Sequence, residues 1–185
     1  RALLDRLAYK DRDGDGYREL PDGKPLTLVL ASTTTAAARA SDELWKRNMD
    51  ALGVRITFLK NKWPELNRMS EAGQLMMWGL MWSSSIPEGI DYYSYFASAN
   101  IGTSNDARLR LPAYDALYEQ ARTVAHGAQR TAVFARLNDM IFGYAPWILT
   151  HYPYENVLVQ PWVKGFKANP FKDQQWQYHD LGPRQ

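Results

Sequence analysis

Cysteine is absent from this 185-residue sequence, so the chain can form neither a disulfide framework nor a thiolate metal site. An excess of one charge is also missing, because 22 Lys and Arg residues face 20 Asp and Glu residues, a net charge of +2. We therefore expect no nucleic-acid partner. No apolar run reaches the roughly 18 residues of a membrane-spanning helix.

Catalytic motifs are equally scarce. The three histidines, His126, His151 and His179, do not have the spacing of a metal site. The sequence contains no Gly-x-Ser-x-Gly nucleophile motif and no glycine-rich phosphate loop. We therefore expect no enzyme activity, and a hydrolase that uses carboxylates on an α/β scaffold is the weakest alternative.

Aromatic residues, in contrast, are abundant: 7 Trp, 11 Tyr and 6 Phe. Part of such a set builds the core of a protein, and an excess often lines a binding surface. The length suits one domain or one lobe of a larger protein. The first predicted helix has no entry signal before residue 1, so we expect the chain to be part of a longer one.

Helical and extended segments alternate in the first half of the chain. The predicted helices cover residues 1–10, 36–52 and 64–73, and the predicted strands cover residues 26–31, 54–60 and 75–82. The third strand is apolar at almost every position, as a strand buried on both sheet faces should be. This order predicts an α/β fold with a mostly parallel or mixed sheet flanked by helices.

The second half begins with an irregular stretch, residues 83–111, which is long enough to be functional or to contain short helices. Two helices are predicted after it, one from Pro112 and one over residues 128–144. Residues 146–163 have strand character broken by Pro153, which predicts two extended pieces.

A candidate ligand site lies where the third predicted strand ends, because ligands bind beyond the carboxyl ends of parallel strands. An indole, three hydroxyls and nearby tyrosines, including Tyr95, could form a polar and aromatic lip there. The alternative is that the indole belongs to the core and the serines only form a turn. The predicted ligand-binding residues are Trp82, Ser83, Ser84, Ser85, Tyr92 and Tyr93.

A calcium loop over residues 11–22 is the second candidate site, and the alternative function is a calcium-stabilised structural module. Oxygen ligands at alternate positions and a glycine at the turn are typical of an EF-hand loop. Its last position, however, holds Asp22 where a bidentate Glu is usual, and a strand follows where a helix should. A turn that is stabilised by its own aspartates is therefore favoured. The predicted metal ligands are Asp11, Asp13, Asp15, Tyr17 and Asp22, with Glu19 at the ninth position.

Five stretches in order resemble the C-terminal part of the family 5 extracellular solute-binding proteins, the dipeptide- and oligopeptide-binding components of bacterial ABC importers. They are LLDRLAYKDRDGDGYRELPDGKPLTLVL, AGQLMMWGLMWSSSIPEGIDYYSYF, PAYDALYEQAR, GYAPWILTHYP and VLVQPWVKGF. Together they cover essentially the whole chain.

This resemblance implies a periplasmic-binding-protein-like fold of type II, cluster C, in a periplasmic or extracellular protein. Residues 1–156 would form the second ligand-binding lobe, and residues 157–185 would return to the first lobe. The resemblance also implies a peptide or peptide-like solute, a membrane permease as partner and no required cofactor. The isolated lobe is expected to be monomeric.

The family's peptide binders carry an Asp three residues after the Trp, and that Asp anchors the amino group of the ligand. Here Ser85 stands three residues after Trp82. A neutral hydroxyl cannot replace a charge-assisted hydrogen bond to an ammonium group. Two interpretations stay open: another acidic group such as Glu88 or Asp91 takes over, or the ligand has no free amino group at this point.

Overall fold

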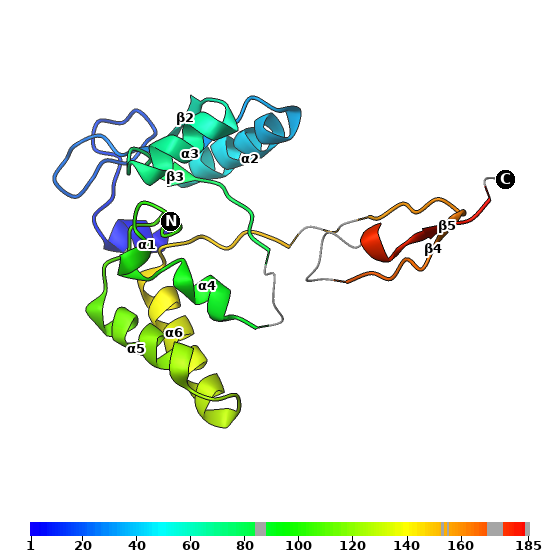
Figure 1. Ribbon diagram of the computed structural model, residues 1–185. Helices are drawn as coiled ribbons and strands as arrows, with labels where there is room; N and C mark the ends of the chain where they lie inside the picture. The colour runs from blue at the N-terminus through cyan, green and yellow to red at the C-terminus, as the bar shows by residue number, and fades with distance from the viewer. Residues whose placement is uncertain (84–87, 153, 155, 170–175, 184–185) are drawn as a thin grey trace. The chain divides into compact units, whose positions relative to one another are not determined.

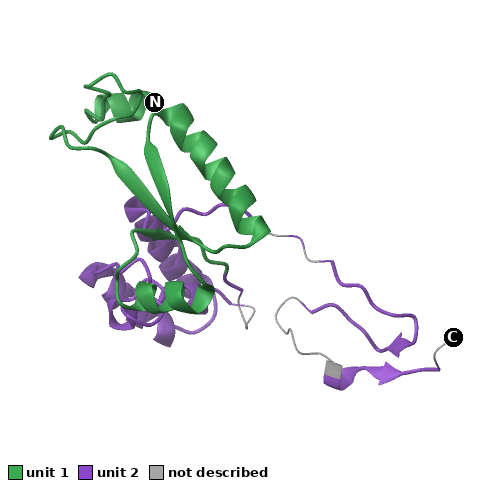
Figure 2. Cartoon of the chain, turned by 90° about the horizontal axis from the view of Figure 1, so that it is seen from above, with its two compact units in different colours: residues 1–81 green, residues 82–185 purple. Residues whose placement is uncertain are grey.

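The computed structural model describes residues 1–83, 88–152, 154, 156–169 and 176–183 (Figure 1). The chain divides into two compact units, Arg1–Met81 and Trp82–Gln185, which Figure 2 colours separately. No helix within the described ranges is both long enough and apolar enough to cross a membrane. The predicted division into residues 1–156 and 157–185 concerns lobes of a longer protein and stays a prediction.

The first unit is built around a parallel sheet. Its strands are β1 (Thr27–Ser32), β2 (Arg55–Lys60) and β3 (Met77–Trp78), in the order β2-β1-β3. The β1–β2 pairing runs from Thr27 opposite Arg55 to Ser32 opposite Lys60. Its helices are α1 (Ala2–Arg6), α2 (Ala36–Leu52) and α3 (Trp63–Glu71). The predicted α/β architecture with a parallel sheet is therefore confirmed.

Helix α2 has clear signals at both ends. The hydroxyl of Thr35 accepts a hydrogen bond from the Ala38 N–H at 3.2 Å, which satisfies one free donor of the first turn. Gly53 ends the helix in the left-handed region with a φ of 69°. Glycine adopts that conformation without steric cost, so the predicted end of this helix is confirmed.

The third predicted strand is much shorter than expected. Residues 75–82 were expected to form a strand buried on both faces, but β3 covers only Met77–Trp78. Met76 is 61% exposed and Met81 is 69% exposed, so the apolar sequence is not covered on both sides within this chain. Hydrophobicity alone indicated burial, whereas strand length depends on pairing with a neighbour.

The second unit has a helical core. Its elements are α4 (Ile90–Ser94), the 3₁₀ helix η1 (Ser98–Asn100), α5 (Pro112–Thr123) and α6 (Ala128–Tyr144), so the stretch expected to be irregular contains two short helices. The core cluster joins α4 to the α5–α6 pair and includes the fully buried Tyr114 and Leu137. The helices predicted from Pro112 and over residues 128–144 are confirmed as α5 and α6.

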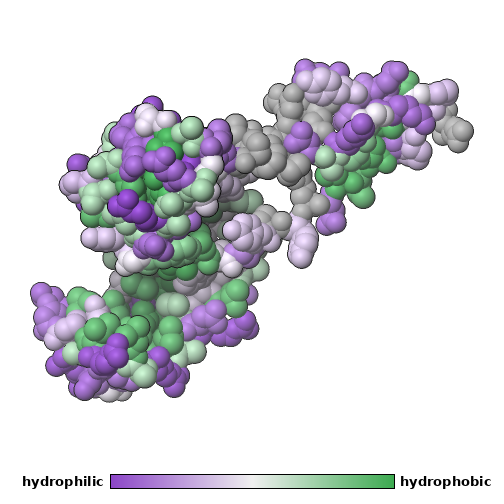
Figure 3. Space-filling view, turned by 90° about the horizontal axis from the view of Figure 1, so that it is seen from below, coloured by the Kyte–Doolittle hydropathy of each residue, from purple (hydrophilic) through white to green (hydrophobic). Residues whose placement is uncertain are grey.

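The rest of the second unit has little regular structure. Its elements are β4 (Val163–Lys164), the 3₁₀ helix η2 (Trp176–Tyr178) and β5 (Asp180–Leu181), and β4 pairs antiparallel with β5. Of the residues 146–163, which were predicted to form two extended pieces, only Val163 is paired in a strand in the part that the structure describes. Several apolar side chains there are exposed, including Ile148, Leu149 and Leu158. Figure 3 shows that the surface of the molecule carries hydrophobic as well as hydrophilic residues.

Candidate functional site

An aromatic cluster in the second unit contains the residue that the sequence placed at the centre of the ligand site. The indole of Trp82 stacks on the ring of Tyr95, with centroids 4.5 Å apart and planes at 28°. Trp147 stacks on Tyr95 as well, at 5.9 Å and 26°, and Tyr92 contacts Tyr95 edge-on at 6.1 Å. We call Trp82, Tyr92, Tyr95 and Trp147 the aromatic site.

The aromatic site is anchored in the core but open at one end. Trp147 also packs on Phe96 at 4.5 Å, and Phe96 is 4% exposed. At the other end Trp82 keeps 38% of its surface exposed. Burial raises the pKa of Tyr95, and the negative charge of Asp91 raises it further. The site therefore presents a partly free indole on a fixed aromatic support, which suits packing against a ligand.

The predicted ligand residues do not all share this surface. Ser83 is exposed next to Trp82, and Tyr92 is half-buried at the aromatic site. Ser84 and Ser85 lie outside the described residues. Trp147 is a member that sequence reasoning missed, because it lies far along the chain and no local pattern links it to Trp82.

Tyr93 occupies a different position from the one expected for a ligand contact. Its ring is 8% exposed, belongs to the core and packs on Phe134 with centroids 4.8 Å apart. Its hydroxyl donates to the Asn138 Oδ1 at 3.2 Å, and its carbonyl accepts from the buried Tyr114 hydroxyl at 2.7 Å. Adjacent residues of a helix point in different directions, so Tyr92 and Tyr93 cannot both face one surface.

The two acidic residues that could replace the missing anchor differ in their surroundings. Glu88 forms an ion pair with Arg130, and the hydrogen bond from Arg130 lowers the pKa of Glu88. Asp91 stands in the first turn of α4, four residues before Tyr95 and therefore on a neighbouring part of the same helix face. Its charge also raises the pKa of Tyr118, whose largest shift comes from burial.

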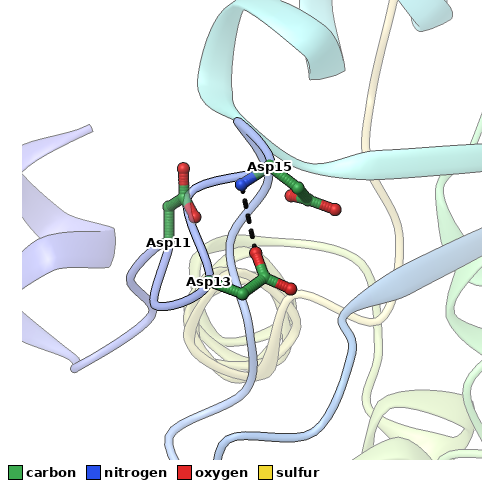
Figure 4. A group of neighbouring side chains, drawn as sticks. All are labelled: Asp11, Asp13 and Asp15. Atoms are coloured by element: carbon green, nitrogen blue, oxygen red, sulfur yellow. Dashed lines mark hydrogen bonds between the residues drawn. The ribbon is translucent and has the colours of Figure 1, made fainter.

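The aspartate-rich loop of the first unit brings three predicted metal ligands together. Carboxylate oxygens of Asp11, Asp13 and Asp15 lie within 4.8 Å of one another, and all three residues are exposed (Figure 4). Figure 4 also shows the Asp13 carboxylate accepting from the Asp15 N–H, at 3.1 Å. Asp22 lies outside this group, and its carboxylate pairs with Lys24 at 2.6 Å.

The same carboxylates stabilise the loop itself. Asp11 accepts from the Gly14 and Gly16 N–H groups at 2.8 and 2.9 Å. Asp15 accepts from the Tyr17 N–H at 2.8 Å and pairs with Arg55. These bonds are those of a turn stabilised by its own aspartates. The self-stabilised turn is the favoured interpretation of the loop, and calcium binding stays the alternative hypothesis.

Known proteins with similar sequences include periplasmic peptide-binding proteins and a heme-binding protein. The chain is 25% identical over 147 residues to the periplasmic oligopeptide-binding protein OppA of Escherichia coli, covering 77% of this chain and 26% of that protein. It is 28% identical over 155 residues to the periplasmic murein peptide-binding protein MppA of the same species, covering 81% and 28%. Heme-binding protein A of Haemophilus influenzae is 25% identical over 130 residues, covering 70% and 24%. No protein-family model matches.

Solved structures share the fold. The oligopeptide-binding protein AppA of Bacillus subtilis, in complex with a nonapeptide, superposes with a TM-score of 0.84 at 19% identity, covering 98% of this chain and 36% of that chain. DppA of Helicobacter pylori, in complex with the peptide STSA, superposes with a TM-score of 0.79 at 18% identity, covering 98% of this chain and 34% of that chain. An oligopeptide-binding protein of Thermotoga maritima with bound mannohexaose gives 0.70 at 17% identity, covering 78% and 28%.

These comparisons confirm the resemblance to the family 5 extracellular solute-binding proteins. The fold is that of type II periplasmic binding proteins. The chain spans about a quarter of the length of the curated relatives it matches.

Proposed function

We propose that these residues form part of the substrate-binding protein of an ABC importer, which binds a peptide or peptide-like solute between two lobes and delivers it to a membrane permease. The observation that carries this proposal is the likeness of 98% of the chain to the peptide-bound AppA and DppA structures. The curated relatives OppA and MppA, both named as periplasmic peptide-binding proteins, support it. Their names also support a periplasmic or extracellular location.

The chemistry of the proposed function is binding alone. Trp82 would pack its free face on the solute, Tyr92 would add an aromatic wall, and Ser83 would donate or accept a hydrogen bond. Closure of two lobes requires that the solute bind the closed form more tightly than the open form. The proposal needs no catalytic residue and no cofactor.

The nature of the solute depends on what replaces the missing anchor. Glu88 is engaged by Arg130, which leaves less of its charge for a ligand ammonium group. The charge of Asp91 acts on Tyr95 of the aromatic site, so we expect a free-amine peptide to use this carboxylate. A solute without an amino group at this point would not need either carboxylate. The mannohexaose complex of a protein named for oligopeptides illustrates that this fold also holds neutral solutes.

The test is a tryptophan fluorescence titration of the full-length protein with trialanine, N-acetyl-trialanine, pentaalanine and mannohexaose. Saturable binding of at least one peptide probe is expected, and Ser85→Asp should tighten trialanine binding while leaving N-acetyl-trialanine binding unchanged. If mannohexaose binds and every peptide probe fails, the peptide assignment is wrong. If the unaltered protein binds trialanine tightly and Ser85→Asp brings no gain, Ser85 does not limit amine recognition.

A further inference from the structure

Arg130 is a charged residue in the core of the second unit. It lies near the start of α6, and its side chain is only 10% exposed. One terminal nitrogen, Nη1, donates to the carbonyl oxygens of Ala121 at 2.5 Å and Val124 at 2.6 Å. These carbonyls belong to the end of α5, where backbone acceptors have no partner within the helix. The guanidinium group therefore caps one long helix from the other.

The remaining contacts of Arg130 lead to α4. Its Nε donates to the carboxylate of Glu88, two residues before α4 begins. Its guanidinium group lies 5.1 Å from the ring centre of Phe134, which packs on Tyr93 of α4. Arg130 therefore contacts α4 in two ways. It binds Glu88, which precedes the helix, and it packs on Phe134, which contacts the ring of Tyr93 within the helix.

The groups around Arg130 depend on its side chain for their hydrogen bonds and their ion pair. Glu88 is its acidic partner, and the Nδ1 of the exposed His126 lies 3.9 Å from the same Glu88 oxygen. Removing Arg130 would leave a partly buried carboxylate and two helix-end carbonyls without their donor. Such groups must then be satisfied by water, and the bonds that hold α4 against α5 and α6 through Arg130 are lost.

Helix α4 and the residue that follows it carry Tyr92 and Tyr95, on which the aromatic site is built. We infer that Arg130 is a positioning residue of the aromatic site: by holding Glu88 and Phe134 it fixes α4 so that Tyr95 meets Trp82 and Trp147. This inference rests on the proposed function for its biological meaning. What it predicts physically is the arrangement of the rings of Trp82, Tyr95 and Trp147, which can be measured without any solute.

The experiment replaces all tryptophans of the chain with 5-fluorotryptophan and records fluorine NMR spectra, with resonances assigned by single Trp→Phe changes. Arg130→Lys keeps the positive charge but loses the planar set of donors that reaches Glu88 and two carbonyls together. The matched control is Arg122→Lys, because Arg122 also pairs with a glutamate, Glu119, but is exposed. Trp82 and Trp147 should shift by more than a linewidth in Arg130→Lys and keep their positions in Arg122→Lys.

The internal reference is the pair Trp45 and Trp63 of the first unit, whose resonances should not move. A lower Tm with unshifted Trp82 and Trp147 would mean that Arg130 only adds stability, and the inference would be wrong. Shifts of all four resonances would also contradict it, because they would report general unfolding. If Arg130→Lys does not fold, Glu88→Gln decides by the same criteria. Because no solute is added, failure of the titration proposed above leaves this result intact.

Discussion

The ring of Tyr95 stacks with two indoles, that of Trp82 with centroids 4.5 Å apart and that of Trp147 with centroids 5.9 Å apart. Aromatic pairs of this kind contribute about 0.5–1.5 kcal/mol beyond the area they bury. Trp82 therefore packs on Tyr95, which is itself packed on Trp147, while 38% of the surface of Trp82 stays exposed. A rigid and accessible indole is what a solute-binding surface requires, since little conformational entropy is lost on binding.

The neighbouring tyrosines Tyr92 and Tyr93 should respond differently to loss of the hydroxyl. Tyr93→Phe removes the bond to Asn138 in the core and should lower the free energy of unfolding by about 0.5–1.5 kcal/mol. Solute affinity should stay unchanged. Tyr92→Phe, at the aromatic site, is the matched variant and should leave stability nearly unchanged. Urea unfolding measures both, and weaker solute binding by Tyr93→Phe without loss of stability would contradict this assignment.

Two glycines provide a matched pair for the end of α2. Gly53→Ala should lower the free energy of unfolding by about 1–2 kcal/mol, because its φ of 69° is left-handed. The added Cβ would also lie 3.2 Å from the Gly16 carbonyl oxygen. Gly143→Ala, inside α6 and with open space around it, should instead raise that free energy by up to about 1 kcal/mol. Equal effects in urea unfolding would disprove the role of Gly53.

Stability should depend on the ionisation of Glu88. Arg130 holds the pKa of Glu88 below its usual value of 4.5, so the folded state favours the charged form. The contribution is therefore present above the pKa of the unfolded chain and is lost as the pH falls through the folded pKa. The Tm of Glu88→Gln should lie below that of the unaltered chain at pH 7. This difference in Tm should shrink as the pH falls below 4.5, the usual pKa of a glutamate.

The control for this titration is Glu119→Gln, which removes a carboxylate from the exposed pair with Arg122. Exposed ion pairs contribute little, so its Tm should follow the unaltered chain over the whole pH range. A constant difference between Glu88→Gln and the unaltered chain from pH 7 to pH 3 would contradict the proposed charge dependence.

Calcium should not be required by the aspartate-rich loop. Its carboxylates already accept hydrogen bonds from backbone N–H groups of the same loop, and Asp15 pairs with Arg55. We expect the same Tm in excess calcium and in excess chelator, and no heat in a calorimetric titration with calcium. A higher Tm with calcium that Asp13→Asn abolishes would establish the loop as a metal site.

Local patterns in the sequence were sufficient for most of the secondary structure. Gly53 ends α2 where the sequence predicted, and alternation of helices with β-branched strands indicated the parallel sheet. The third strand was overestimated, because Met76 and Met81 are apolar but exposed. An apolar segment indicates that its side chains favour apolar contacts. The length of the strand that it forms depends on pairing with a neighbouring strand, which the segment's own sequence does not specify.

The candidate site was predictable only around Trp82. The stack on Tyr95 joins residues of one stretch, but Trp147 comes from beyond α6 and enters through tertiary packing. The pairing of Glu88 with Arg130 also links distant segments, and no spacing rule connects them. Such contacts depend on how helices pack, which composition and periodicity do not specify.

The most direct test of the account is the effect of Trp82→Ala on solute affinity in the full-length protein. The solute is the probe that binds best in the fluorescence titration, and calorimetry measures its Kd. Trp63→Ala is the control, because Trp63 is also exposed but lies in α3 of the first unit. The account predicts at least about tenfold weaker binding for Trp82→Ala, or ~1.4 kcal/mol, and unchanged binding for Trp63→Ala. Equal affinities of the two variants and the unaltered protein would contradict it.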